Sequence, residues 1–216
     1  MIGWLCGLAL AGKGVEVPVD IGVGPAAHWV TGPVAQQDPL LGGLAISIEA
    51  VLDKKTIRKF RRRIPSEYRQ MVLQMDEVRI SHPLIPDTLW IHPAGLTGTT
   101  GMYGIGWRPL GVGVPLIREP FKLDLSAGPR LTYAYLHSTV LPSPTHFLRP
   151  GIDATLEVEI PFSERFLVSF GWDSQVYIPQ EVGGSILETA PLDASIWHIG
   201  QAFLKFHFRV PYTVKL

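Results

Sequence analysis

The side chains that most often carry out chemistry are sparse and scattered in this chain. The seven histidines occur at no spacing that places two of them on one metal ion, and the single cysteine, Cys6, excludes an internal disulfide and a cysteine-cluster metal site. His137 precedes Ser138, a candidate base beside a candidate nucleophile, but the sequence identifies no carboxylate to complete a triad. We therefore predict no metal, no cofactor and no catalytic residue.

Closely spaced glycines at 101–106 are the second feature that could do chemistry. Glycine-rich turns bind phosphates where they join a strand to a helix. Here Tyr103, Ile105 and Trp107 alternate with glycines, as in a strand, and no helical pattern follows. The chain also lacks a P-loop, G-x-S-x-G and H-E-x-x-H. A nucleotide site and the common hydrolase sites are therefore excluded.

The composition favours a buried parallel sheet or a membrane barrel. The chain is 46% hydrophobic and only 18% charged, whereas charged residues make up about a quarter of a typical soluble domain. No apolar run reaches the ~18 residues that a membrane-spanning helix needs. The formal net charge is +0, which leaves no electrostatic signature of nucleic-acid binding.

The C-terminal segment has the strongest periodicity. From Ile196 to Leu216 nearly every second residue is apolar or small, with His198 as the exception, and most residues between the later ones are polar. Alternation with a period of two predicts a strand with one apolar and one polar face. Six more segments alternate in the same way: 15–23, 44–52, 103–107, 121–135, 152–160 and 166–172.

An eighth strand is expected within Glu77 to His92, although Pro83 and Pro86 interrupt it. With eight strands, the long connections 31–40, 136–150 and 179–194 follow odd-numbered strands, and the tight links follow even-numbered ones. Long loops at one end and short turns at the other are typical of outer-membrane barrels. Pro129, inside the fifth strand, is expected to mark a bulge or the exit of the strand from the membrane.

A membrane barrel must close on itself to satisfy its backbone, so the apolar faces would meet lipid and the polar faces would line the lumen. Aromatic residues near strand ends would form interfacial girdles, namely Trp29, Trp90, Trp107, Trp172, Tyr103, Tyr133, Tyr135 and Tyr177. Eight strands enclose a space that side chains fill. We predict a lumen network of Glu49, Arg108, Lys122, Asp124, Arg130, Asp153, Glu157, Glu159, Arg165, Asp173, Lys205, His207 and Arg209.

Over nearly its whole length, the pattern resembles the small eight-stranded outer-membrane β-barrel proteins of Gram-negative bacteria. The last strand is similar to the assembly signal of that family, formed here by Phe206, Phe208, Val210, Tyr212, Val214 and Leu216. It departs from the usual form by ending in Leu and by containing Pro211. The resemblance implies an all-β, closed antiparallel transmembrane barrel in the bacterial outer membrane, with outer-membrane lipid and the barrel-assembly machinery as partners.

A basic, partly helical insert at 53–76 breaks the rule of short turns after even-numbered strands. Its cations are Lys54, Lys55, Arg58, Lys59, Arg61, Arg62, Arg63 and Arg69. A helix is expected from Ser66, with Ser66 as its cap. The insert could be a solvated linker, a docking site for a periplasmic or envelope-complex protein, or a contact for anionic lipid.

Two units describe the chain. Residues 1–11 read as a truncated signal peptide, because an apolar run ends in the small-x-small form of a cleavage site, and residues 12–216 form a single barrel domain. We expect a structural or anchoring component of the envelope, with a lumen plugged by charged side chains and no enzyme activity. The alternatives are a porin-like channel for small solutes, a lipid-modifying enzyme that uses His137, and a soluble lipocalin-like barrel with the opposite facing.

Overall fold

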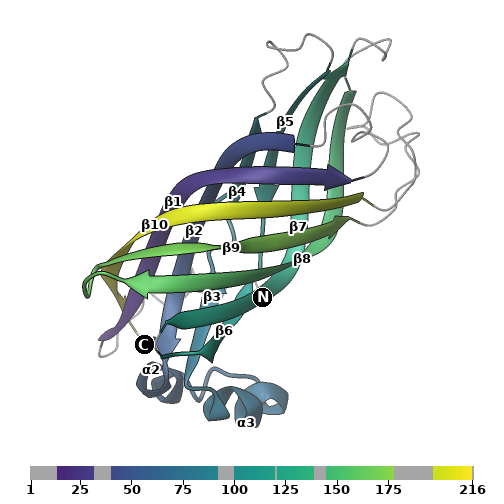
Figure 1. Ribbon diagram of the computed structural model, residues 1–216. Coiled ribbons are helices and arrows are strands. Elements are labelled where there is room, and N and C mark those ends of the chain that lie inside the picture. The colour runs from purple at the N-terminus through teal and green to yellow at the C-terminus, as the bar shows by residue number, and fades with distance from the viewer. Residues whose placement is uncertain are drawn as a thin grey trace.

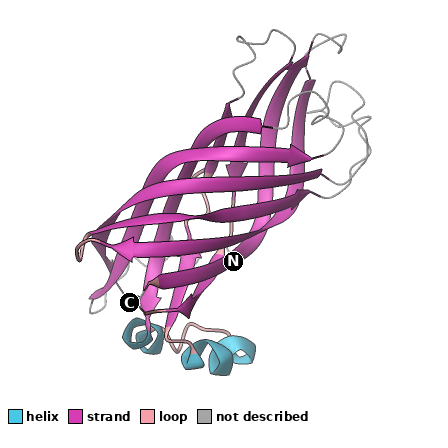
Figure 2. Ribbon diagram, viewed as in Figure 1, coloured by secondary structure: helices cyan, strands magenta, loops and turns pink. Residues whose placement is uncertain are grey.

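The computed structural model describes residues 14–31, 40–91, 100–119, 121–138, 145–177 and 197–215. Within them the chain is mostly β-structure, with two short helices (Figures 1 and 2). No helix among these residues is long and apolar enough to cross a membrane. The elements are β1 (Gly14–Thr31), β2 (Leu40–Asp53), α2 (Lys54–Lys59), α3 (Ser66–Gln74), β3 (Glu77–Ser81), β4 (Thr88–Ile91), β5 (Thr100–Trp107), β6 (Val112–Ile117), β7 (Lys122–Ser138), β8 (Thr145–Pro161), β9 (Phe166–Tyr177) and β10 (Trp197–Lys215).

These strands close into one antiparallel barrel. β1 pairs with both β2 and β10, which joins the first strand to the last. β3 and β4 both pair with β2, and β5 and β6 both pair with β7, so each of these two pairs of short strands forms one strand of the barrel. The prediction of a closed, eight-stranded antiparallel barrel is therefore confirmed.

The interrupted strand between 77 and 92 is present in two halves. Ala45 and Glu49 of β2 pair with Thr88 and Ser81, so four residues along β2 match seven on the neighbouring strand. Three extra residues therefore bulge out of the ladder, in the segment that holds Pro83 and Pro86. The break suits the prolines, because neither has an N–H to donate to a ladder. The neighbouring barrel strand is broken beside it, between β5 and β6.

Pro129 does not mark the end of a strand, and the bulge beside it lies in the neighbouring strand, where five steps from Trp107 to Val112 face four steps from Ala127 to Leu131. β7 pairs with β8 in one unbroken register from Lys122 to Leu136. On the other side, the pairing of β7 stops at Ala127 and resumes at Leu131, opposite the break between β5 and β6. Pro129 is exposed on the outward face, within this unpaired stretch.

The two ends of the barrel differ. The helices α2 and α3 lie at the end where β1 begins and β10 finishes, and the tight β8–β9 turn belongs to the same end (Figure 1). The long connections expected at the opposite end fall mostly outside the described residues, and so does the expected signal peptide at 1–11. The short links and the helical insert thus share one end of the barrel.

The outward face is apolar, as the alternation predicted, and the inward face is polar. Exposed aromatic side chains on the outside include Trp29, Tyr103 and Trp172. Trp90 and Tyr177 do not belong to an outer girdle, because they point inward and are 1% and 2% exposed. Gly104 makes room for Trp90, since a Cβ on Gly104 would lie 2.4 Å from the indole ring. The glycine spacing that suggested a phosphate turn therefore has a packing role.

Candidate functional site

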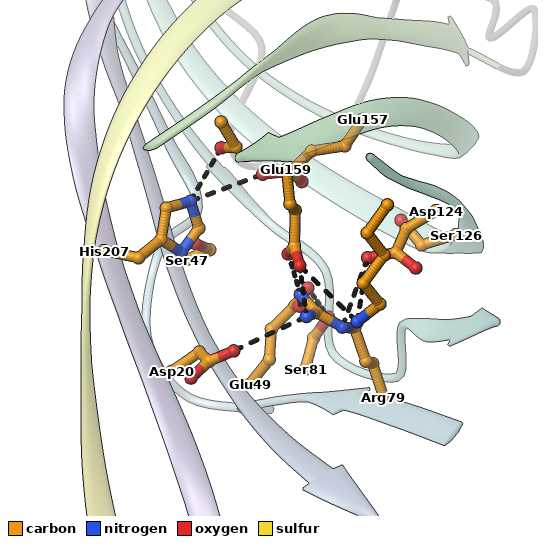
Figure 3. A network of polar contacts seen from close by, with 12 residues as sticks. Asp20, Ser47, Glu49, Arg79, Ser81, Asp124, Ser126, Glu157, Glu159 and His207 are labelled. Carbon is orange, nitrogen blue, oxygen red and sulfur yellow. Dashed lines mark hydrogen bonds and ion pairs between the residues drawn. The ribbon is translucent and has the colours of Figure 1, made fainter. Parts of the chain in front are cut away.

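Arg79 on β3 is the centre of a polar cluster in the lumen (Figure 3). Its side chain is 4% exposed, and its guanidinium contacts carboxylates from several strands around the barrel. The distances are 3.3 Å to Glu77, 3.4 Å to Glu49 and to Asp124, 3.5 Å to Asp20, and 2.8 Å from Nη2 to Glu159 Oε2. One cation thus connects five acidic side chains.

Two further cations reach the Arg79 cluster from the helical end of the barrel. Lys122 lies 2.5 Å from Glu77 and 3.4 Å from Glu159. Arg209 donates to both oxygens of Asp20, with Nε–Oδ1 at 2.6 Å and Nη2–Oδ2 at 2.8 Å. The five carboxylates therefore share three cations, so the lumen at this end carries a local excess of negative charge.

Arg108 and Arg130 form a second cluster with three aspartates. Arg130 donates from both Nη atoms to Asp87 at 3.0 Å, in the paired geometry that strengthens such bonds, and to Asp153 at 2.8 Å. Arg108 lies 2.9 Å from Asp153 and 3.4 Å from Asp173. Asp87 ends the proline-containing break between β3 and β4, so this break supplies one of the carboxylates in the lumen.

Glu157, Lys205 and His207 form a third cluster. Lys205 Nζ lies 3.0 Å from Glu157, and His207 Nε2 lies 3.3 Å from the same carboxylate. Ser169 Oγ is 2.7 Å from that same Nε2. A catalytic triad uses the two ring nitrogens for different partners, whereas serine and carboxylate here meet on one nitrogen. The arrangement therefore differs from that of a catalytic triad.

A ladder of uncharged side chains continues the polar lumen. Tyr177 hydroxyl contacts Thr132 at 2.9 Å and donates to Gln175 at 2.8 Å. Gln175 donates to Gln201 at 3.1 Å, and Thr88 donates to Gln201 at 2.7 Å. All five side chains are buried.

A cavity of about 50 Å³ lies within the lumen beside β2. Its lining includes Ser47, Glu49, Asp87, Glu157 and Lys205, and it also reaches the break between β3 and β4. A volume of this size holds a few water molecules at most. Its charged lining suits water better than an apolar ligand.

The structure brings twelve of the thirteen residues predicted for the lumen network inside the barrel. These are Glu49, Arg108, Lys122, Asp124, Arg130, Asp153, Glu157, Glu159, Asp173, Lys205, His207 and Arg209, the last of them partly exposed. Arg165 is the exception: it is exposed in the turn between β8 and β9, beyond the start of β9 at Phe166. Its position in the alternation pointed inward, but the barrel wall ends before it.

Sequence reasoning missed the central residue of the network. Arg79 lies in the strand that its prolines made hardest to place, so its face could not be assigned. Asp20 could have been predicted as a lumen residue from the sequence. It alternates with the apolar residues of β1, just as the predicted lumen residues do on their strands. Glu77 and Asp87 border the same interrupted strand and were missed for the same reason.

The basic insert begins directly after β2. Asp53 caps α2 by accepting the backbone N–H of Thr56 at 2.7 Å. The expected helix from Ser66 is present as α3, but Pro65 occupies the cap position and Ser66 makes no capping hydrogen bond. Ser66 instead donates to Glu67 at 3.1 Å. The insert therefore contains two helices, and the cap supported by hydrogen bonding belongs to the first.

Most cations of the insert are left without an ion-pair partner. Lys54 bonds Asp76 at 2.7 Å, and this hydrogen bond is the main reason that the pKa of Asp76 is lowered. Arg69 donates to the carbonyl of Ile64 at 3.1 Å. The other six are exposed, and none of them forms an ion pair within the described part of the chain: Lys55, Arg58, Lys59, Arg61, Arg62 and Arg63.

The residues predicted as the assembly signal lie on the outward face of β10. Phe206, Phe208 and Tyr212 are exposed, and Val210 and Val214 are half-buried. Leu216 lies outside the described residues. His137, the candidate for a lipid-modifying enzyme, belongs to β7, but its side chain is outside the described part.

The fold and the lumen together define the class: a small, closed, eight-stranded antiparallel barrel with an apolar exterior and a charged interior, as in small outer-membrane barrels. Among solved structures the chain is similar to Ail, the attachment invasion locus protein of Yersinia pestis, with a TM-score of 0.50 and 10% identity over 91% of this chain and 100% of that one. Weaker likenesses are Neisserial surface protein A (TM-score 0.46, 13% identity, 92% and 97% covered) and the outer membrane protein OprG from Pseudomonas aeruginosa (0.44, 10%, 92% and 98%). No protein-family model and no curated protein matches the chain. At these identities the likeness concerns the fold alone.

Proposed function

We propose that this protein is an outer-membrane barrel that serves as a structural or anchoring component of the bacterial envelope, with a lumen closed by its own side chains. The single observation that carries the proposal is the lumen itself. Carboxylates and cations from parts of the barrel wall that do not pair with each other make contact across the interior. Arg79 contacts Glu159, Arg108 contacts Asp173, and Arg130 contacts Asp87. The cavity of about 50 Å³ is too small for a solute path.

An outer-membrane location is supported by the closed fold and by the exposed apolar side chains around it. A large exposed apolar band is unfavourable in water and favourable in lipid. The outward aromatic residues Phe206, Phe208 and Tyr212 on β10 support recognition by the barrel-assembly machinery as part of the same proposal.

Conductance across planar lipid bilayers tests the closed lumen. We expect the refolded full chain to show no steady conductance steps, because side chains cross the lumen and the cavity beside β2 holds only a few water molecules. A Glu157→Ala/Lys205→Ala variant is the matched control: it removes an ion pair without leaving either charge unpaired, and it widens the cavity, so its leak should exceed that of the wild type. Steady, step-like conductance by the wild type would overturn the proposal in favour of a porin-like channel.

A further inference from the structure

The charge of the chain is divided unevenly between the insert and the barrel. Residues 54–75 contain eight Lys and Arg residues and one acidic residue, which leaves eleven basic and eighteen acidic residues for the rest of the chain. In the lumen, Arg79, Arg108, Arg130 and Lys205 each contact at least one carboxylate. Among the residues that the structure describes, six exposed cations of the insert make no such contact. The barrel therefore has an excess of acidic residues, and one strongly cationic segment lies at one of its ends.

This segment is close to the apolar band of the barrel wall. Lys54 is the first residue after β2, so the cations begin where a strand of the barrel ends. Phe162 and Phe166, beside the tight β8–β9 turn, and Tyr212 near the end of β10 are exposed at the same end of the barrel. Exposed aromatic residues at the end of a membrane barrel mark the level of the lipid headgroups.

The second helix adds an apolar contribution. Tyr68 and Met71 are three residues apart on α3, which places them on one side of the helix, and they are 54% and 53% exposed. Exposed apolar side chains next to a run of cations are typical of segments that lie in the membrane interface. An acidic protein partner would account for the cations, but it would not account for the exposed apolar side chains of Tyr68 and Met71 at the same end of the barrel.

We infer that the basic insert binds the anionic headgroups of phospholipids in the leaflet at its own end of the barrel, with Tyr68 and Met71 entering the interface. This inference rests on the proposed membrane location and names the chemistry that the anchoring surface recognises. Each Lys or Arg near an anionic surface strengthens such binding about fivefold. Salt weakens it, because exposed charges are screened.

An environment-sensitive fluorophore at Met71→Cys, on a Cys6→Ser background, tests the inference in nanodiscs that hold the full barrel. We expect the emission to shift to the blue as phosphatidylglycerol replaces phosphatidylcholine. Arg61→Gln/Arg62→Gln should weaken the binding by about 25-fold, at about fivefold for each cation, and should therefore move the midpoint to a higher phosphatidylglycerol content. Arg118→Gln/Arg165→Gln removes two exposed cations outside the insert and should leave the midpoint nearly unchanged.

Three outcomes would overturn the inference. The first is an emission wavelength that does not change with the phosphatidylglycerol content. The second is an equal change of the midpoint in both double variants. The third is the same blue shift when inorganic phosphate is added to discs of phosphatidylcholine alone. The first would leave an acidic periplasmic protein as the partner of the insert, and the last would indicate binding of free phosphate. The bilayer conductance of the same preparation is independent of these results, so a failure here is distinguishable from a failure of the closed lumen.

Discussion

At the scale of single residues, the interior depends on Arg79. Four of its five acidic partners are on other strands, and two of these, Asp20 and Glu159, are themselves almost fully buried. A buried ion pair adds little net stability compared with apolar packing, but removing one partner leaves an uncompensated charge in a poorly solvated place. The consequence is greatest for Arg79, because its loss leaves five carboxylates with only Lys122 and Arg209.

Arg79→Met should therefore lower the free energy of unfolding by about 3–5 kcal/mol. Urea unfolding in detergent micelles, followed by gel mobility, measures this change. Arg165→Met is the control, because Arg165 is exposed outside the network, and it should stay within about 0.5 kcal/mol of the wild type. Adding Glu159→Gln to Arg79→Met should recover part of the loss. Equal stability of the Arg79 and Arg165 variants would show that the network carries no stability.

At the scale of elements, the regular strands were predictable and the irregular ones were not. Alternation alone located β7, β8, β9 and β10, because a half-exposed strand imposes its period on the sequence. It could not show that the third and fourth barrel strands are each built from two pieces. The break depends on pairing with neighbours, and a single strand does not encode its partner's register. The inward positions of Trp90 and Tyr177 were missed because aromatic residues suit either face of a strand.

The insert shows the same limit for helices. Ser66 was expected to cap α3 because of its residue type, but it makes no capping hydrogen bond. The capping hydrogen bond is found at α2, where Asp53 accepts it from the N–H of Thr56. A capping oxygen that satisfies a free N–H of the first turn is worth about 1 kcal/mol. Whether a given polar residue forms this hydrogen bond depends on the backbone conformation just before the helix, which the sequence does not specify.

Asp53→Ala should consequently destabilise α2 by about 1 kcal/mol, whereas Ser66→Ala should be neutral. Limited trypsin digestion of the folded protein measures the stability of α2 through the rate of cleavage, since trypsin cuts after Lys and Arg and the insert is rich in both. We expect faster cleavage within 54–63 for Asp53→Ala and an unchanged rate for Ser66→Ala. Faster cleavage in the Ser66 variant alone would mean that α3 is the capped helix.

At the scale of the whole molecule, closure makes the lumen and the wall a single unit. Arg209 on β10 bonds Asp20 on β1, so a polar pair reinforces the seam where the first and last strands meet. The sequence predicted which faces carry charge, because the period of two is fixed. It did not predict which charges meet, since pairs across a barrel depend on strand tilt and stagger. The contacts of Arg79 with Glu159 and of Arg108 with Asp173 therefore form only in the closed structure.

The insert is outside this closed unit, and the barrel should fold without it. Asp53 pairs directly with Glu77, so β2 and β3 are close enough at this point for a two-residue Asn-Gly turn to replace residues 54–76. We expect this variant to remain folded in cold SDS and to shift on heating as the full chain does, because every strand of the barrel is retained. Loss of the heat-dependent shift would mean that the insert is needed to complete the barrel, for which the buried Ile57 of α2 is the first side chain to examine.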